Sequence, residues 1–298
     1  MKILIYLSLI YTLCAVGNVA RADQSSITEA DGQACMGDDK SRKQTEHVAL
    51  EDAKRLAIEY TSTHLSSSTT VENYQLKEDI VHAFNAATVK VLKILDEKWA
   101  NPTVSDCFTI KIKAEVIPSK EAMAKVDQKQ VMADPRLPLD VKLWVNRTDA
   151  TYSGGQDMRV YLQGNKPFYA RLIYVQADGT NVQLLPNPHR TANYFAGATI
   201  FEVPTGEDNF QLTIGPPYGK EKLTLYASTL PLGKLSTKAA AGNAVYMVND
   251  QPREIAEKTR GISINTGPSK QKEVAEFAEA SVDVTTKADA PAPAKPAS

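Results

Sequence analysis

The sequence predicts an α+β protein in which a small two-helix αβ domain precedes an all-β, sandwich-like domain. Three features of the 298-residue chain indicate this architecture. Apolar residues recur at helical spacing in two segments of residues 27–118. Many short runs separated by turn residues fill residues 137–286. Between them lies a charged stretch that ends at two prolines, which predicts a linker over residues 119–136, with a short helix in its first half as an alternative.

The first domain is expected to hold two helices and two strands. Ser41 and Gln44 have the spacing of a capping box. After them, small and apolar residues recur every three or four positions, which favours an amphipathic helix with a small-residue face. A second helix is predicted over residues 76–86. The runs TVKVLKIL (88–95) and FTIKIKAEV (108–116) are typical of strands.

The run at residues 108–116 alternates without a break, so its side chains divide between two faces. One face carries Phe108, Ile110, Ile112, Ala114 and Val116. The other carries Thr109, Lys111, Lys113 and Glu115. We expect the apolar face to meet the helices and the polar face to meet water or a partner.

The second domain is expected to consist of short strands, which argues for a sandwich or a barrel. The candidate strands are LDVKLWVNR, QDMRVYLQG, FYARLIYVQ, NVQLLP, ATIFEVP, NFQLTIG, KLTLYAST and ASVDVTT. Residues 235–272 are less regular and are interpreted as an excursion before ASVDVTT returns to the sheet. Residues 287–298 are rich in Pro and Ala and are expected to be disordered.

Asp178 and Gly179 predict a tight hairpin turn, because the second central position needs a positive φ that glycine adopts at little cost. The flanking runs, residues 170–175 and 182–185, supply the two strands. The segment is therefore interpreted as a structural hairpin.

Residues 1–22 have the organisation of a secretory signal peptide. Lys2 precedes an apolar run of about 14 residues, and the pattern Ala20-Arg21-Ala22 follows. The run is short of the roughly 20 residues that cross a bilayer, so no transmembrane helix is expected after cleavage. Cys14 leaves a lipoprotein alternative, which the bulky Tyr11-Thr12-Leu13 before it disfavours. We therefore expect an exported protein, periplasmic or at the cell surface, without a lipid anchor.

The charge balance argues against a nucleic-acid partner. Once Lys2 and Arg21 are removed with the signal peptide, 32 of the 34 basic residues remain against 35 acidic residues, a net charge of −3. Proteins that bind nucleic acid carry a basic patch or stripe instead.

Cys35 and Cys107 are the two cysteines that remain after signal removal. An even number in an oxidising compartment favours a disulfide. It would close a loop of 72 residues and stabilise the fold by about 4 kcal/mol through loop-closure entropy. The alternative is a pair of buried free thiols. A metal site is not expected, because neither cysteine has another Cys or a His at ligand spacing.

No local motif supplies a catalytic site. His189 follows Pro186-Asn187-Pro188 in an expected exposed loop, without a local nucleophile or orienting carboxylate. The sequence has no phosphate-binding loop, dinucleotide fingerprint or calcium-binding loop. We therefore expect neither an enzyme activity nor a cofactor.

The second half resembles the bacterial domain-of-unknown-function 4384 family. The resemblance spans about residues 136–230. It rests on Lys166-Pro167-Phe168-Tyr169 leading into RLIYVQADG, on LLPNP, on Gly197 before IFEVP, and on IGPPYGKEKLTLYAS. The element Pro-Pro-Tyr-Gly-x-Glu at residues 216–221 is its most recognisable part. The family has no established biochemistry, and its occurrence in envelope proteins and beside signalling kinases implies a binding module.

The first domain is similar to the small αβ domain of flagellar assembly protein T and related envelope lipoproteins. This resemblance rests on Ala34-Cys35-Met36-Gly37, on a helix with Ala-x-x-x-Ala spacing, and on the closing run Ala-Glu-Val-Ile-Pro. The chain departs from those lipoproteins because it lacks a good lipidation site.

These observations predict a non-catalytic, exported envelope protein that binds or assembles with a protein or cell-wall glycan partner. The expected binding surface is the loop of Pro216, Pro217 and Tyr218, followed by Pro186, Asn187 and His189. Exposed proline and aromatic side chains lose little entropy on binding. The alternative for the first loop is that Tyr218 packs on its own domain.

Two other classes of function stay open. The first is an envelope hydrolase whose catalytic residues meet only in the fold. The second is a structural subunit of a surface assembly, which would associate with itself in a concentration-dependent way.

Overall fold

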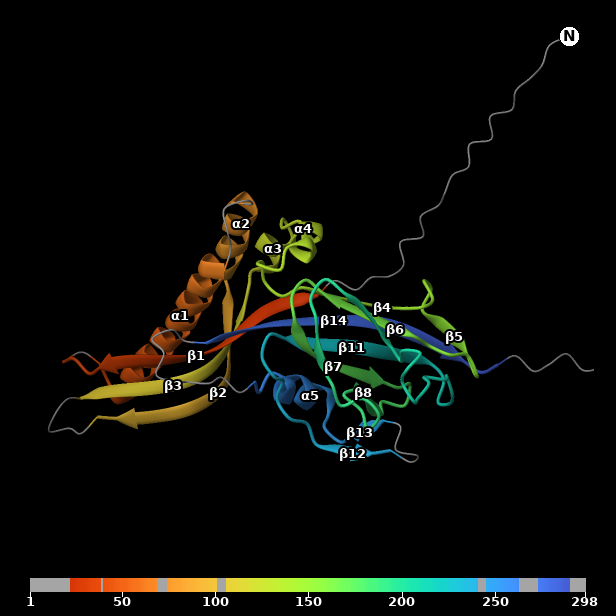
Figure 1. The fold of residues 1–298 in the computed structure, drawn as a ribbon. Helices are drawn as coiled ribbons and strands as arrows, with labels where there is room; N and C mark the ends of the chain where they lie inside the picture. The colour runs from red at the N-terminus through yellow and green to blue at the C-terminus, as the bar shows by residue number, and fades with distance from the viewer. Residues whose placement is uncertain are drawn as a thin grey trace, which may run out of the picture.

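The computed structural model shows an α+β protein (Figure 1). It describes residues 22–38, 40–68, 74–100, 106–240, 245–262 and 273–289. The predicted signal peptide, apart from Ala22, and residues 290–298 of the predicted tail lie outside the described residues. Among the helices of the described segments, none is long and apolar enough to span a bilayer.

Helices and strands alternate irregularly along the chain. The helices are α1 (Arg42–Ser68), α2 (Tyr74–Asn85), α3 (Lys120–Met123), α4 (Gln128–Ala133) and α5 (Pro252–Thr259). The strands are β1 (Asp23–Cys35), β2 (Thr88–Trp99), β3 (Cys107–Ile117), β4 (Val141–Val145), β5 (Thr151–Ser153), β6 (Val160–Gly164), β7 (Phe168–Val175), β8 (Asn181–Leu185), β9 (Tyr194–Phe195), β10 (Ile200–Val203), β11 (Lys220–Ser228), β12 (Thr237–Ala239), β13 (Tyr246–Val248) and β14 (Val274–Lys287).

One large sheet continues through both halves of the molecule, in the order β12-β13-β8-β7-β11-β14-β1-β3-β2. A smaller sheet has the order β10-β6-β4. The long strand β14 pairs with β11 on one side and with β1 on the other. The predicted layout of two domains is therefore not confirmed, because a single sheet joins them. We call β1–β3 with α1 and α2 the helix-covered end, and the paired sheets around β4–β11 the sandwich.

In the helix-covered end, the backbone of α1 lies close to the backbone of β1. α1 begins at a capping box, in which Ser41 N donates to Gln44 Oε1 at 2.8 Å and Gln44 N donates to Ser41 Oγ at 3.3 Å. Ala49 and Ala53 face β1 and are fully buried. A Cβ atom on Gly32 of β1 would lie 2.1 Å from the Ala49 carbonyl oxygen. Glycine and alanine therefore let helix and strand pack closely.

The alternation predicted for β3 is confirmed. Its apolar face, which includes Ile112 and Ala114, is buried beneath α1 and α2. The predicted disulfide between Cys35 and Cys107 is also present. The two cysteines lie directly opposite each other, where β1 pairs with β3.

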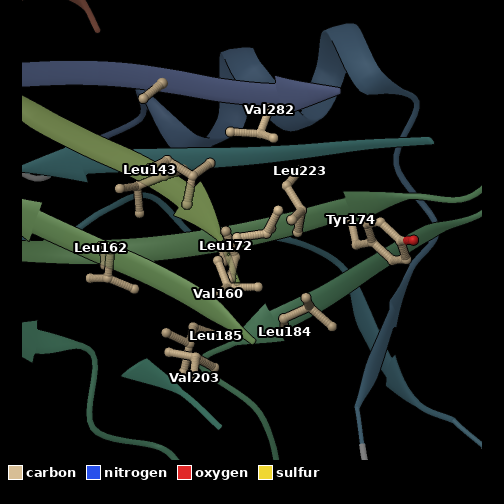
Figure 2. Packing of buried hydrophobic residues seen from close by; sticks show 14 of the residues in the cluster. Leu143, Val160, Leu162, Leu172, Tyr174, Leu184, Leu185, Val203, Leu223 and Val282 are labelled. Atoms are coloured by element: carbon tan, nitrogen blue, oxygen red, sulfur yellow. The ribbon is translucent and has the colours of Figure 1, made fainter. Parts of the chain in front are cut away.

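The core of the sandwich lies between the two sheets (Figure 2). Leu143 and Leu162 come from the smaller sheet, and Leu172, Leu223 and Val282 come from the larger one. All five side chains are buried. These large aliphatic side chains are what hold the sheets together.

The segment predicted as a linker, residues 119–136, is folded. It forms α3 and α4, which are capped by the side chains of Ser119 and Asp127. Met123 and Val131 are buried in the core of the helix-covered end. The segment is therefore a packed connection between the two halves.

The predicted hairpin of β7 and β8 is present, with antiparallel pairing. Gln176 N donates to Thr180 O at 2.9 Å, and Gly179 has a φ of +85°. The loop between these two residues spans Ala177–Gly179, so it is one residue longer than a two-residue turn. Glycine supplies the positive φ that such a loop requires.

Several strand assignments differ from the sequence pattern, since the short strands β5, β9, β12 and β13 lie outside the predicted runs, and two further differences concern longer segments. Residues 209–215, predicted as a strand, form only an isolated bridge between Asp157 and Thr213. Their apolar residues, Phe210 and Ile214, are nevertheless buried in the sandwich core. Conversely, DQSSITEADGQAC forms β1 although its small and polar residues carry no strand signal. Residues 24–30 of this strand are buried, and β14 and β3 flank it.

Candidate binding groove

A groove with a cavity volume of about 600 Å³ lies where the helix-covered end meets the sandwich. The start of β1, the end of β3, α3 and the C-terminal end of α5 contribute its walls. We call it the junction groove. Its lining includes Asp23, Lys90, Glu115, Pro118, Met123 and Arg260.

Arg260, directly after α5, is the central charged residue of the junction groove. Its Nε donates to Glu115 Oε1 and its Nη2 donates to Glu279 Oε2, both at 2.8 Å. Its guanidinium carbon lies 4.7 Å from the centroid of the Phe277 ring. Ser25 Oγ donates to Glu115 Oε1 at 2.8 Å. Burial alone would lower the pKa of Arg260, but the two carboxylates outweigh burial and raise that pKa.

Cationic side chains also hold the C-terminal end of α5. Arg171 Nη1 donates to Thr259 Oγ1 at 2.9 Å, and Lys113 Nζ donates to Ile262 O at 2.6 Å. Burial lowers the pKa of Arg171 to about 10 and also lowers the pKa of Lys113. The negative end of a helix dipole favours cations at this position. The polar face of β3 is therefore partly covered by the chain itself.

The rim of the junction groove carries three charged side chains. Lys90, Lys120 and Asp23 are exposed and make no ion pair within the described segments. The Oε1 atom of Gln128, which also lines the groove, is buried without a hydrogen-bond partner. A ligand in the groove would therefore meet two cations, a carboxylate and an amide acceptor.

A second buried cluster ties the two halves together on the opposite face of β14. Glu276 Oε2 accepts hydrogen bonds from Lys166 Nζ and from Leu139 N, both at 2.7 Å. Glu276 Oε1 lies 3.1 Å from His64 Nε2. Burial alone would raise the pKa of Glu276, but the hydrogen bond from His64 and the charge of Lys166 outweigh it and lower that pKa. The carboxylate thus connects α1, the β6–β7 loop and the segment before β4.

The first predicted binding loop lies before β11 and is only partly available. Pro216 is exposed, whereas Pro217 and Tyr218 are half-buried. Tyr218 packs against the sandwich core, and a Cβ on Gly154 would lie 2.5 Å from its hydroxyl oxygen. The structure therefore gives Tyr218 the packing role that the sequence left as an alternative.

The second predicted loop is less exposed than the sequence suggests. The Asn187 side chain is fully buried. Its Oδ1 accepts from His189 N and its Nδ2 donates to Leu184 O, both at 2.8 Å. Asn187 therefore shapes its own loop and does not reach the surface. His189 is exposed and stacks on Phe210, and Pro186 is half-buried.

The fold does not bring these two loops together. Gly219, next to Tyr218, approaches Ala177 beyond the end of β7. Asn193, which follows the second loop, bonds through its carbonyl to Ala170 near the start of β7. Neither loop lines the junction groove.

Sequence patterns did not point to the junction groove. Arg260 follows Glu115 by 145 residues, so no local spacing connects them. The one available signal was the polar face of β3, on which Glu115 and Lys113 lie. The partners of this face, Arg260 and Ile262, follow α5 and come from a distant part of the sequence.

The histidine, cysteine and acidic side chains of the described segments form no group of three or more that could hold a metal ion. The charged groups at the base of the groove are bonded to each other. Such an arrangement suits recognition by fixed charges and hydrogen bonds.

No curated protein and no solved structure matches this chain. A family match is found for part of the sandwich, and the residues that line the junction groove lie outside it. It does not reach residues 27–118, so the resemblance of that part to flagellar assembly protein T is not confirmed. Residues 151–231 match the family described as Domain of unknown function (DUF4384), which confirms the predicted resemblance of the second half of the chain.

Proposed function

We propose that this chain is an exported bacterial envelope protein that binds a protein partner through the junction groove and has no catalytic role. The observation that carries the proposal is the groove itself, a cavity of about 600 Å³ with a fixed charged base and a rim whose charges have no ion pair among the described residues. Clefts of this size with a few placed polar groups are typical ligand sites.

Export is supported by the sequence of residues 1–22 and by the disulfide. The pattern of Lys2, an apolar run and Ala20-Arg21-Ala22 is that of a cleaved signal peptide. The bond between Cys35 and Cys107 is compatible with an oxidising compartment such as the periplasm or the cell surface.

A binding role is supported by the state of the charged groups at the base of the groove. Glu115 already accepts hydrogen bonds from Arg260 and Ser25, and Arg260 also bonds Glu279. A general acid or base must exchange its proton during the reaction. Side chains fixed by mutual ion pairs are better suited to orienting a bound partner.

A protein partner is favoured over a glycan by the walls of the groove. Ile117, Pro118 and Met123 supply apolar surface, and the start of β1 supplies strand backbone. Protein interfaces combine an apolar centre with a charged rim in this way.

The test is affinity capture of the tagged protein from crosslinked envelopes, followed by mass spectrometry of co-purifying proteins and wall fragments. Wild type is compared with the double variant Lys90→Glu/Lys120→Glu and with Tyr218→Ala. We expect one protein to be enriched with wild type and with Tyr218→Ala, and to be lost with the double variant.

Other outcomes reject parts of the proposal. Loss with Tyr218→Ala alone would move the binding surface to the loop at residues 216–218. Enrichment of wall fragments alone would make the partner a glycan. If nothing exceeds an empty-tag control and the pure protein self-associates in sedimentation, the binding proposal is wrong and a structural subunit is favoured.

A further inference from the structure

The junction groove contains an open strand edge. β1 pairs with β14 from Asp23 onward, but its pairing with β3 begins only at Ser26, opposite Val116. β3 ends at Ile117, and Pro118 follows, which has no N–H group to continue the ladder. The first three residues of β1 therefore have a strand on one side only.

The hydrogen-bond pattern of β14 shows which backbone groups face this edge. Glu276 O accepts from Thr229 N, and Thr286 N donates to Gly219 O, so the even-numbered residues of β14 bond towards β11. The odd-numbered residues consequently bond towards β1, where Glu279 lies opposite Asp23.

The same alternation fixes the direction of the backbone at the start of β1. Asp23 and Ser25 lie opposite Glu279 and Phe277, and both bond towards β14. The N–H and C=O groups of Gln24 therefore point the other way, to the side of the groove where Pro118 lies beyond the end of β3, and Gln24 as a whole is 7% exposed. Gln24 lines the groove, and no strand of the described segments pairs with it on that side.

We infer that the junction groove binds an extended peptide segment of the partner, which adds a strand to β1 beside Gln24. The inference rests on the proposed function and specifies its mode of binding. Exposed sheet edges recognise extended peptides through main-chain hydrogen bonds, with pockets for alternate side chains.

The two sides of the groove differ in chemistry, as alternate side chains of a bound strand require. Met123 belongs to the apolar core beneath α1 and α2. Lys90 lies opposite Glu115 in the β2–β3 ladder, on the face where Arg260 binds. A bound peptide would thus direct apolar side chains to one side and polar side chains to the other.

The unpaired charges specify the peptide further. Lys90 and Lys120 are two cations without an ion pair within the described segments, and cleavage after Ala22 would add the α-amino group of Asp23, against the single carboxylate of that residue. The buried Gln128 Oε1 is an acceptor in need of an N–H donor. The occupant is therefore an extended peptide in which an acidic side chain alternates with apolar ones.

The test starts from a phage library of random hexapeptides selected on the exported, disulfide-bonded protein. Enriched sequences are synthesised, and their affinity is measured by fluorescence anisotropy for wild type, Gln24→Pro and Gln24→Ala. Proline removes the N–H that faces the groove, and alanine retains it. Both variants lose the Gln24 side chain and its 2.9 Å hydrogen bond to Leu139 O, so they form a matched pair.

We expect acidic and apolar hexapeptides to bind wild type and Gln24→Ala with affinities within about threefold, and Gln24→Pro at least about tenfold more weakly. On wild type, N-methylation of alternate peptide amides should cause a similar loss, and this arm does not depend on the folding of a variant. Lys90→Glu should weaken binding of the acidic peptides and not of their Gln analogues.

The inference is overturned if the library yields no enriched peptides, or if Gln24→Pro and N-methylated peptides bind as well as their parents. These failures differ from a failure of the proposed function. A partner captured from envelopes through the groove, together with a failed peptide selection, would leave the binding module standing and reject only strand addition.

Discussion

The helix-covered end and the sandwich share one sheet, but different forces stabilise them. At the helix-covered end, Gly32, Ala49 and Ala53 bring α1 close to β1, and a disulfide closes the far end of the β1–β3 pair. The helix-covered end also buries large side chains such as Phe84 and Ile112 beneath its helices, but its core is smaller than that of the sandwich, which buries side chains such as Phe168 and Leu172 between two sheets. The smaller core buries less apolar surface, so a covalent link is most useful there.

The two regions meet at buried charges. Glu276 lies on one face of β14 and Glu279 on the other, and each bonds to groups from distant parts of the chain. A buried ion pair adds little net stability but is costly to break. The buried charges around Glu276 and Glu279 therefore fix how the two ends are placed more than they add to the free energy of unfolding.

The largest expected effect comes from the sandwich. Phe168 is fully buried and stacks on Phe195, with ring centroids 5.7 Å apart. Phe168→Ala should lower the free energy of unfolding by about 3–5 kcal/mol, because it leaves a cavity in a closely packed core. Urea denaturation measures this loss. The control is Ile200→Ala, since Ile200 is 56% exposed, and it should cost less than about 1 kcal/mol. Equal losses in the two variants would contradict the assignment of this core.

The second prediction concerns the disulfide of the helix-covered end. Replacing both Cys35 and Cys107 by serine should cost about 2–4 kcal/mol, because the 72-residue separation leaves a long loop unconstrained in the unfolded chain. Hydrogen exchange should accelerate in α1 and β3 and change little in β6. A reducing agent should destabilise wild type and leave the double variant unaffected. Uniform acceleration throughout the sheet would show that the two ends do not differ in this respect.

The smallest effect concerns the buried carboxylate of Glu276, whose contribution to stability depends on pH. The pKa of Glu276 is lowered in the folded state, so its stabilising contribution is present above the unfolded pKa of about 4.3 and is lost as the pH falls through the folded pKa. Between about pH 5 and pH 3, wild type should therefore lose more stability than Glu276→Gln. Urea denaturation at each pH measures the difference.

The matched control for this titration is Glu207→Gln, because Glu207 is exposed. Its pH profile should follow that of wild type. If Glu276→Gln also follows wild type, Glu276 does not couple the two ends through its charge.

Local patterns predicted the features that depend on neighbouring residues. The capping box of Ser41 and Gln44, the alternation of β3 and the hairpin at Gly179 each involve a few consecutive residues, and the structure contains all three. The disulfide was predictable for a different reason, because removal of the predicted signal peptide would leave two cysteines and so a single intramolecular pairing.

Features that depend on distant residues could not be predicted. β1 is buried because β14 and β3 flank it, and its small polar residues carry no strand signal. Asn187 looked exposed because it lies between two prolines, yet its amide is used inside its own loop. In both cases the surroundings, rather than the residue type, decide the outcome.

The sequence by itself determined the α+β class, the DUF4384 resemblance, the hairpin and the cysteine pair, because periodicity, turn chemistry and composition act over short stretches. Only the tertiary structure decided that one sheet joins the two halves and that Arg260, Glu115 and Glu279 meet beside an open edge of β1. The physical reason is that strand order and charge pairing depend on contacts between residues far apart in the sequence, such as the 145 positions between Glu115 and Arg260, which no local pattern records.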